Sequence, residues 1–261
     1  MQPFLSKMKY TAKHLIIETF CVILVGVMLL ACKSKTQPIA PDAVVADSMA
    51  SEKTLAPGAA HAGFCRIKDS IPDIIVELRY CSTHNFVGKR IDGYEAPVPM
   101  LTKEAASALR KVADELRKKG YLLKIYDAYR PQCAVDHFLR WAQDPADTVM
   151  KSEFYPDIEK SAIFRRGFVA RKSSHTRGSA VDLTIVHADT GEEVNMGGTF
   201  DFFGEISHTD YEGISDEQRQ NRELLHTVMV RYGFKPARGE WWHFMLLNEP
   251  YPDTYFTFPV K

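Results

Sequence analysis

The feature that most limits what this chain can fold into is a short apolar run near its N-terminus. The run extends from Phe20 to Ala31 with the sequence FCVILVGVMLLA, and Lys7, Lys9 and Lys13 precede it. A basic segment followed by an apolar run of this length is typical of a secretory signal peptide, and the run is too short to span a bilayer comfortably. A folded domain is therefore expected only after this run. That leaves roughly 200 residues, which is enough for one hydrophobic core.

The residues after the run resemble a lipoprotein cleavage site followed by a tether. Leu29-Leu30-Ala31-Cys32 is similar to the cleavage box of bacterial lipoproteins, in which the Cys becomes the lipidated first residue. Residues 32–62 are rich in Ala, Ser and Pro without a sustained period, as in flexible linkers. We therefore expect a lipoprotein signal peptide at 1–31, a tether with lipidated Cys32 at 32–62 and one domain at 63–261. An uncleaved membrane anchor is the alternative. Either would place the domain outside the cytoplasm, held to the membrane on its periplasmic or cell-surface side.

Charge and cysteine content argue against two other kinds of site. Lys+Arg and Asp+Glu both number 33, so the chain has no basic excess and we expect no nucleic-acid partner. The predicted domain contains Cys65, Cys81 and Cys133, and three thiols allow at most one disulfide within the chain. Their spacing is not that of a Cys-rich zinc site. A disulfide between Cys81 and Cys133 stays open, because sequence does not give the distance between them.

Two helices are predicted in the first half of the domain. Apolar residues recur at helical spacing between Thr102, which fits an N-cap, and Gly120, which fits a C-terminal cap. Pro131 disfavours helix at the preceding residue and favours helix after it, so a second helix is expected over Gln132 to about Gln143.

A third helix and four strands complete the expected fold. Ser215 and Gln218 form a capping box that opens the helix, and Gly233 ends it. Apolar and β-branched runs predict strands at 74–80, 121–126, 180–186 and 240–246. Because helices and strands do not alternate as regular βαβ units, the fold class is expected to be α+β. A mostly antiparallel central sheet with flanking helices fits this pattern.

Two short segments offer the residues for metal chemistry. Residues 173–182 read SSHTRGSAVD and place His175 and Asp182 around a glycine-containing turn that leads into a predicted strand. Residues 240–243 read EWWH and offer His243 and a second carboxylate, Glu240. Two imidazoles and one carboxylate form a ligand set that zinc accepts, with a fourth position left for water. A carboxylate beside the metal but not bound to it can take the proton of that water.

These segments, taken with several others, resemble a known family. The pattern S-x-H-x-x-G-x-A-x-D followed by E-x-x-H is similar to the hedgehog/D-Ala-D-Ala carboxypeptidase-like metallopeptidases. Further motifs narrow the resemblance to the vancomycin-resistance-type (VanX-like) zinc D-Ala-D-Ala dipeptidases, and these are LRYCSTHNFVG, YDAYRPQCAVDHF, SSHTRGSAVDLT, FDFFGEISH, EWWHF and EPYPDTYFTFPVK. They occur in order across most of residues 65–261, and the resemblance does not cover the leader or the tether.

The resemblance implies roles for five residues of the reaction centre. His175, Asp182 and His243 would bind one Zn²⁺ per chain, and Glu240 would be the general base. Arg130, in the segment DAYRP, would face the oxyanion, because a guanidinium is permanently charged and holds its donors in a rigid fork.

The resemblance also implies three contacts to the substrate. Asp201 would lie beside the substrate ammonium, and Ser173 and Tyr80 would lie near the bound dipeptide. Asp and Ser in loops are more commonly turn formers or helix caps, so a purely structural role stays open for these residues.

The function expected from the sequence is zinc-dependent hydrolysis of D-alanyl-D-alanine to two D-alanines outside the cytoplasm, linked to cell-wall peptide turnover. The partners expected are a small D,D-dipeptide and, through the lipid anchor, the membrane. A peptidoglycan D,D- or L,D-carboxypeptidase with a more open cleft is one alternative, and a non-catalytic zinc-binding module is another. The long segment 187–214 favours small substrates if it closes the cleft.

Overall fold

The computed structural model describes residues 61–163 and 165–261. The predicted signal peptide, Cys32 and the tether as far as residue 60 lie outside the described residues. Within the described residues, no helix is both long and apolar enough to cross a membrane.

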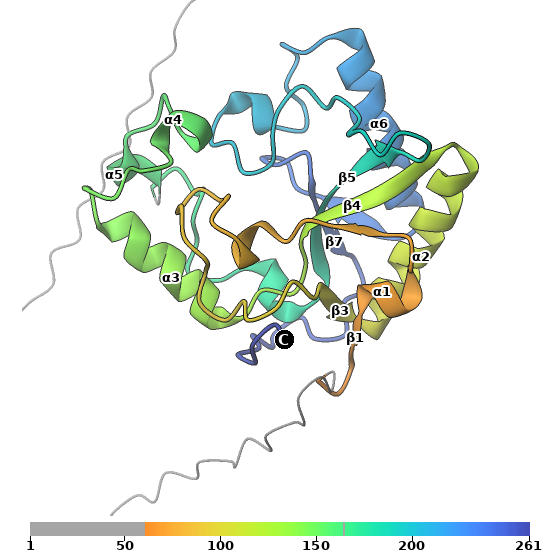
Figure 1. Ribbon diagram of the computed structural model, residues 1–261, viewed down its shortest axis with the longest axis horizontal. Coiled ribbons are helices and arrows are strands. Elements are labelled where there is room, and N and C mark those ends of the chain that lie inside the picture. Colours follow the sequence, from red (N-terminus) through yellow and green to blue (C-terminus); the bar gives the residue numbers. More distant parts are fainter. Residues whose placement is uncertain (1–60, 164) are drawn as a thin grey trace, which may run out of the picture. The chain divides into compact units, whose positions relative to one another are not determined.

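A mixed five-stranded sheet forms the centre of the domain (Figure 1). Its strands lie in the order β2-β4-β5-β7-β6, and they are β2 (Ile75–Val76), β4 (Tyr121–Asp127), β5 (Ala180–His187), β7 (His243–Leu246) and β6 (Phe234–Pro236). Only the β2–β4 pair is parallel, and the other pairs are antiparallel. Strands β1 (Phe64–Arg66) and β3 (Met100–Thr102) form a separate antiparallel pair.

Helices cover both sides of this sheet. In Figure 1, α2 (Lys103–Lys118) lies on one side of β4 and β5, whereas α3 (Gln132–Gln143), α4 (Lys151–Phe154) and α5 (Lys160–Ile163) lie on the other. Helix α6 (Asp216–Arg231) contacts α2 and β6. The short helices are α1 (Ile67–Ser70) and the 3-10 turns η1 (Arg79–Cys81), η2 (Ser174–Arg177) and η3 (Glu205–Ser207). Because both faces are covered, every residue of β5 from Ala180 to Val186 is buried. The α+β class expected from the sequence is confirmed.

The predicted helix ends are confirmed at α2 and α6. The Thr102 side chain accepts a hydrogen bond from the Ala105 N–H at the start of α2. At α6, Ser215 and Gln218 form both hydrogen bonds of the capping box. These bonds satisfy N–H groups that the first turn of a helix leaves without partners.

Two of the predicted strands are shorter than expected. From 74–80, only Ile75–Val76 pairs with β4, and after the Glu77 N–H donates to the Ile125 carbonyl the chain turns into η1. This turn buries Tyr80 among aromatic rings. In an edge strand, the Tyr80 side chain would be half exposed. From 240–246, the strand begins only at His243, because the His243 N–H closes a turn onto the Glu240 carbonyl.

The three cysteines of the described residues are free thiols. The Cys81–Cys133 disulfide that the sequence left open is therefore not formed. Burial raises the pKa of both thiols, so neither has the character of a reactive thiolate.

Candidate active site

Three adjacent strands and one 3-10 turn bring the two histidines and Asp182 together. Asp182 on β5 pairs with Asp127 of β4 on one side and with His243 of β7 on the other. His175 lies in η2, immediately before β5, and Gly178 with φ 78° ends that turn. A side chain at Gly178 would run into the Phe64 ring, so the tight turn requires glycine. The backbone register therefore places both imidazoles beside the Asp182 carboxylate.

The distances in this cluster fit one metal ion. His243 Nδ1 lies 2.9 Å from Asp182 Oδ1, and His175 Nε2 lies 3.2 Å from Asp182 Oδ2. The two ring nitrogens, His175 Nε2 and His243 Nδ1, are 3.0 Å apart. Zinc ligands at about 2.0–2.1 Å in a tetrahedral arrangement would be separated by about 3.3 Å. The cluster is thus close to the size of a zinc coordination shell.

The other nitrogen of each imidazole is already hydrogen-bonded. His175 Nδ1 donates to the Ala128 carbonyl at 2.7 Å, and His243 Nε2 lies 3.1 Å from Ser174 Oγ. Because a carbonyl can only accept, His175 carries its hydrogen on Nδ1 and presents the Nε2 lone pair to the cluster, and His243 presents its Nδ1 lone pair when Ser174 Oγ accepts from Nε2. Two lone pairs facing one carboxylate attract a cation, and this is how metal-binding histidines are usually oriented.

The charges of the cluster support the same interpretation. Burial alone would raise the pKa of Asp182, but His175 and His243 outweigh it and hold that pKa below its usual value. Burial lowers the pKa of His243, yet the Asp182 carboxylate outweighs that effect and raises it. Asp182 is therefore an anion at neutral pH, as a metal ligand must be.

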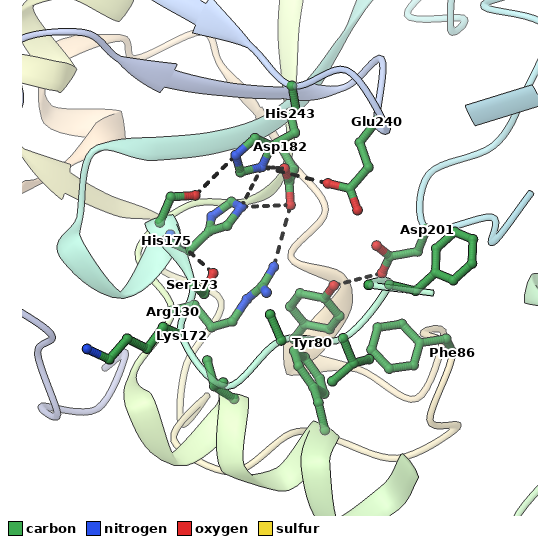
Figure 2. Close-up of a pocket in the computed structure, with 18 of the residues that line it drawn as sticks. Tyr80, Phe86, Arg130, Lys172, Ser173, His175, Asp182, Asp201, Glu240 and His243 are labelled. Carbon is green, nitrogen blue, oxygen red and sulfur yellow. Dashed lines mark hydrogen bonds and ion pairs between the residues drawn. The ribbon is translucent and has the colours of Figure 1, made fainter. Parts of the chain in front are cut away.

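Glu240 lies beside this cluster without belonging to it. Its Oε2 is 3.9 Å from His243 Nδ1, and its side chain is 37% exposed. The turn that delays the start of β7 puts this carboxylate at the wall of the cavity (Figure 2). Partial burial, together with the nearby Asp182, raises the pKa of Glu240. A carboxyl group with a raised pKa can both accept and return a proton near neutral pH.

Arg130 is held in place by Asp127. The Arg130 Nε and one terminal nitrogen both lie 2.9 Å from Asp127 Oδ2, and Tyr94 donates to the other oxygen at 2.6 Å. Asp127 is fully buried, and the Arg130 guanidinium also lies over the ring of Tyr80 at 4.9 Å. Its terminal nitrogen is 3.6 Å from Asp182 Oδ2, so the charge of Arg130 faces the reaction centre.

Asp201 and Tyr80 form a second polar group, separate from the metal-ligand cluster. Tyr80 donates its hydroxyl to Asp201 Oδ2 at 2.8 Å, and both side chains are buried. Burial, and then repulsion from Asp182, raise the pKa of Asp201 well above its usual value. Asp201 also has φ 62°, and among the described residues it is the one non-glycine in this left-handed region. Such backbone strain is commonly retained at functional sites.

One cavity of about 240 Å³ connects the two groups (Figure 2). All eight residues that the sequence singled out for this site line it: Tyr80, Arg130, Ser173, His175, Asp182, Asp201, Glu240 and His243. Much of the remaining wall is apolar, with Phe86, Val135, Phe138, Phe168, Val169 and Phe203. Ser173 also caps η2 by accepting a hydrogen bond from the His175 N–H, so it has the structural role that its residue type favours as well.

Three residues of this site were not singled out by the sequence analysis. Asp127 lies within the DAYRP segment, three residues before Arg130, and this spacing could have predicted an ion pair between the two side chains. Ser174 adjoins His175, but its bond to His243 depends on a contact across 69 residues. Arg222 donates to the carbonyls of residues 196, 206 and 208, on both sides of Asp201. No local sequence pattern indicated that contact.

Comparison with known proteins places the chain in a family. Residues 60–261 match the Peptidase_M15 family, described as D-ala-D-ala dipeptidase. A D-alanyl-D-alanine dipeptidase of Enterococcus faecalis is 46% identical over 199 residues, which are 76% of this chain and 98% of the relative. Dipeptidases of the same name from Enterococcus faecium and Streptomyces coelicolor are 43% and 41% identical, with the same coverage of each chain. The chain therefore belongs to the D-Ala-D-Ala dipeptidase family of metallopeptidases, as its motifs indicated.

Proposed function

We propose that this protein is a zinc-dependent dipeptidase that hydrolyses D-alanyl-D-alanine to two D-alanines. One observation carries the proposal: a complete His175–Asp182–His243 ligand set and a buried carboxylate, Asp201, line one small cavity. Typical pockets for drug-sized ligands measure about 300–1,000 Å³, so a cavity of about 240 Å³ suits a smaller substrate.

The side chains around the cluster supply the steps of amide hydrolysis. A bound Zn²⁺ would polarise the scissile carbonyl and acidify the attacking water. Glu240 accepts the proton of this water and later delivers it to the departing amine. Arg130, fixed by Asp127, donates to the oxygen that becomes negative as the carbonyl carbon is attacked. Because the guanidinium is already held in place, it does not have to reorganise during the reaction.

Asp201 would recognise the free amino group of the substrate. A buried carboxylate with a raised pKa regains its charge when an ammonium group binds beside it. Tyr80 fixes the orientation of the carboxylate through its hydroxyl. In a dipeptide, the ammonium lies one residue before the scissile bond, whereas in a longer peptide a neutral amide occupies that position.

Two alternatives fit these features less well. A carboxypeptidase that trims peptidoglycan stems needs room for the rest of the stem, and a buried Asp201 at the end of a small cavity does not suit it. A non-catalytic zinc module has no need for Glu240 or Arg130 beside the metal ligands, yet both line the same cavity.

Product analysis of the purified protein tests this proposal. The protein, with zinc bound, is incubated with D-Ala-D-Ala or with L-Ala-L-Ala, and free alanine is measured. We expect D-alanine from the first substrate, little product from the second, and loss of activity after chelation that zinc restores. Equal hydrolysis of both dipeptides, or full activity in the chelated protein, would contradict the proposal.

We further propose that the protein acts outside the cytoplasm as a lipoprotein anchored through Cys32. The lysines before the apolar run and the Leu29–Cys32 box support this location. There, the enzyme would act on D-Ala-D-Ala released during cell-wall turnover. Replacing Cys32 by Ala in the full chain should move the protein from the membrane fraction to the soluble fraction, measured by fractionation of expressing cells. Unchanged membrane attachment of that variant would contradict lipidation at Cys32.

A further inference from the structure

A dipeptide has two charged ends, and the cavity offers a partner for one of them in Asp201. Figure 2 shows Asp201 on one side of the metal-ligand cluster and Lys172 on the other side, below His175, with its ammonium turned away from the cluster. A substrate that spans the cluster with its ammonium at Asp201 therefore directs its carboxylate toward Lys172. Opposite charges at opposite ends of the cavity match a zwitterion.

Lys172 is the cation at this end that is free to bind an anion. It lines the cavity and is exposed, and its ammonium lies over the Tyr255 ring at 4.7 Å. Among the residues that the structure describes, it forms no salt bridge with a carboxylate. Its four-carbon stem allows the ammonium to move between the ring and the mouth of the cavity without any change of backbone.

Arg130, the other cation of the cavity wall, is already engaged. Asp127 accepts from its Nε and one terminal nitrogen at 2.9 Å, and the same group faces Asp182. Arg130 thus remains beside the scissile bond and does not reach outward to the end of the substrate. Ser173, next to Lys172, is placed to assist. Its oxygen accepts from the His175 N–H, which leaves its hydroxyl hydrogen available to donate.

We propose that Lys172 binds the C-terminal carboxylate of the dipeptide and makes the enzyme select substrates with a free carboxylate. The proposal rests on the proposed dipeptidase function. The ammonium leaves the Tyr255 ring and pairs with the carboxylate, and Ser173 donates a hydrogen bond to the same group. The pair forms at the mouth of the cavity, so its contribution is that of a partly solvated ion pair.

Steady-state kinetics with D-Ala-D-Ala and D-Ala-D-alaninamide test the proposal, because the amide removes only the substrate's negative charge. We expect Lys172→Gln to lower kcat/KM for D-Ala-D-Ala roughly five- to tenfold, mainly through KM. The amide should be hydrolysed equally well by the wild type and this variant. Lys172→Arg should restore the preference for the free acid. Arg166→Gln, which removes another exposed cation of the same segment, should behave like the wild type.

The outcomes separate this inference from the proposed function. If the wild type does not hydrolyse D-Ala-D-Ala, the dipeptidase assignment itself fails. If the wild type is active but Lys172→Gln leaves the ratio of acid to amide unchanged, the carboxylate assignment alone is overturned. An equal fall for both substrates also overturns it, since Lys172 would then support the structure of the site. If Arg166→Gln changes the ratio of acid to amide hydrolysis as much as Lys172→Gln does, the overall positive charge of this segment attracts the carboxylate, and a specific pair with Lys172 is overturned.

Discussion

The two ends of the cavity are built in different ways. At the end where we propose that zinc binds, called here the metal end, Asp182 and His243 are paired residues of adjacent strands, and His175 lies in a short turn directly before β5. At the recognition end, Asp201 lies in the long connection between β5 and α6, where the one regular element is the three-residue η3. The metal end is fixed by sheet register, whereas the recognition end depends on contacts made by side chains.

Arg222 supports the recognition end from α6. Its guanidinium donates at 2.6, 2.8 and 2.9 Å to the carbonyls of Met196, Ile206 and His208, so it joins α6 to both sides of the Asp201 loop. It also lies over the Trp241 ring, next to Glu240 in sequence. Burial lowers the pKa of Arg222 to about 10, which still leaves it charged at neutral pH. The hydrogen bonds of Arg222 involve none of the three proposed metal ligands, so mutations at the two ends should have separable effects.

The largest effect is expected at the metal end. Asp182→Ala removes one of the three proposed metal ligands, so we expect loss of most bound zinc and of nearly all activity, equally for D-Ala-D-Ala and N-acetyl-D-Ala-D-Ala. Metal content by elemental analysis and kinetics with both substrates check this result. Asp189→Ala, an exposed carboxylate just after β5, is the matched control and should retain both zinc and activity. Tight stoichiometric zinc in Asp182→Ala would show that Asp182 is not a ligand.

Glu240→Gln should separate the chemistry from metal binding at the same end. In the proposed mechanism this carboxylate transfers protons and does not hold the metal, so we expect zinc to remain and kcat to fall by about two to four orders of magnitude. Free and acetylated dipeptides should lose activity equally. If zinc is lost with the carboxylate, Glu240 is a ligand and the division of roles at this end is wrong.

Asp201→Asn should instead change the ratio between substrates. The variant loses a charged partner for the ammonium, so kcat/KM for D-Ala-D-Ala should fall roughly tenfold to a hundredfold. N-acetyl-D-Ala-D-Ala, which has no ammonium, should change far less. Zinc content should equal that of the wild type. Equal losses for both substrates would place Asp201 among the structural supports and not at the ammonium.

The smallest effect on turnover is expected for Ser174→Ala. Losing the hydroxyl that orients His243 should weaken zinc affinity about tenfold to a hundredfold, as for other outer-shell partners of metal ligands. Competition with a chelator measures the affinity. At saturating zinc, kcat should return close to the wild-type value. Unchanged zinc affinity would show that the Ser174–His243 bond does not set the orientation of the imidazole.

The same contrast explains how much of the molecule the sequence could predict. Hydrophobic period and cap residues located α2, α3 and α6, because these signals are local. The apolar residues of 74–80 predicted one long strand. The structure instead has a short strand followed by a tight turn that buries Tyr80. The short β1–β3 pair was also missed, because strands of three residues carry almost no period.

The candidate site follows the same rule. All eight residues that the sequence singled out line one cavity, since each lies in a motif that could be recognised locally. Asp127 contacts Arg130 only three residues away, so sequence could have suggested it, whereas Ser174 and Arg222 act by contacts between distant segments, such as the bonds from α6 to the Asp201 loop. Distances of that kind are fixed only by tertiary packing. Sequence alone therefore does not predict the contacts of Ser174 and Arg222.

The most direct test of the account compares the wild type on D-Ala-D-Ala and on a stem pentapeptide that ends in D-Ala-D-Ala. In the pentapeptide, a neutral amide would replace the ammonium beside the buried Asp201, so the charged hydrogen bond that stabilises the bound dipeptide, worth about 1.5–3 kcal/mol, would not form. We therefore predict a kcat/KM for the dipeptide that exceeds that for the pentapeptide by roughly tenfold to a hundredfold. Comparable kcat/KM values for the two substrates would contradict the dipeptidase assignment and favour a wall-trimming carboxypeptidase.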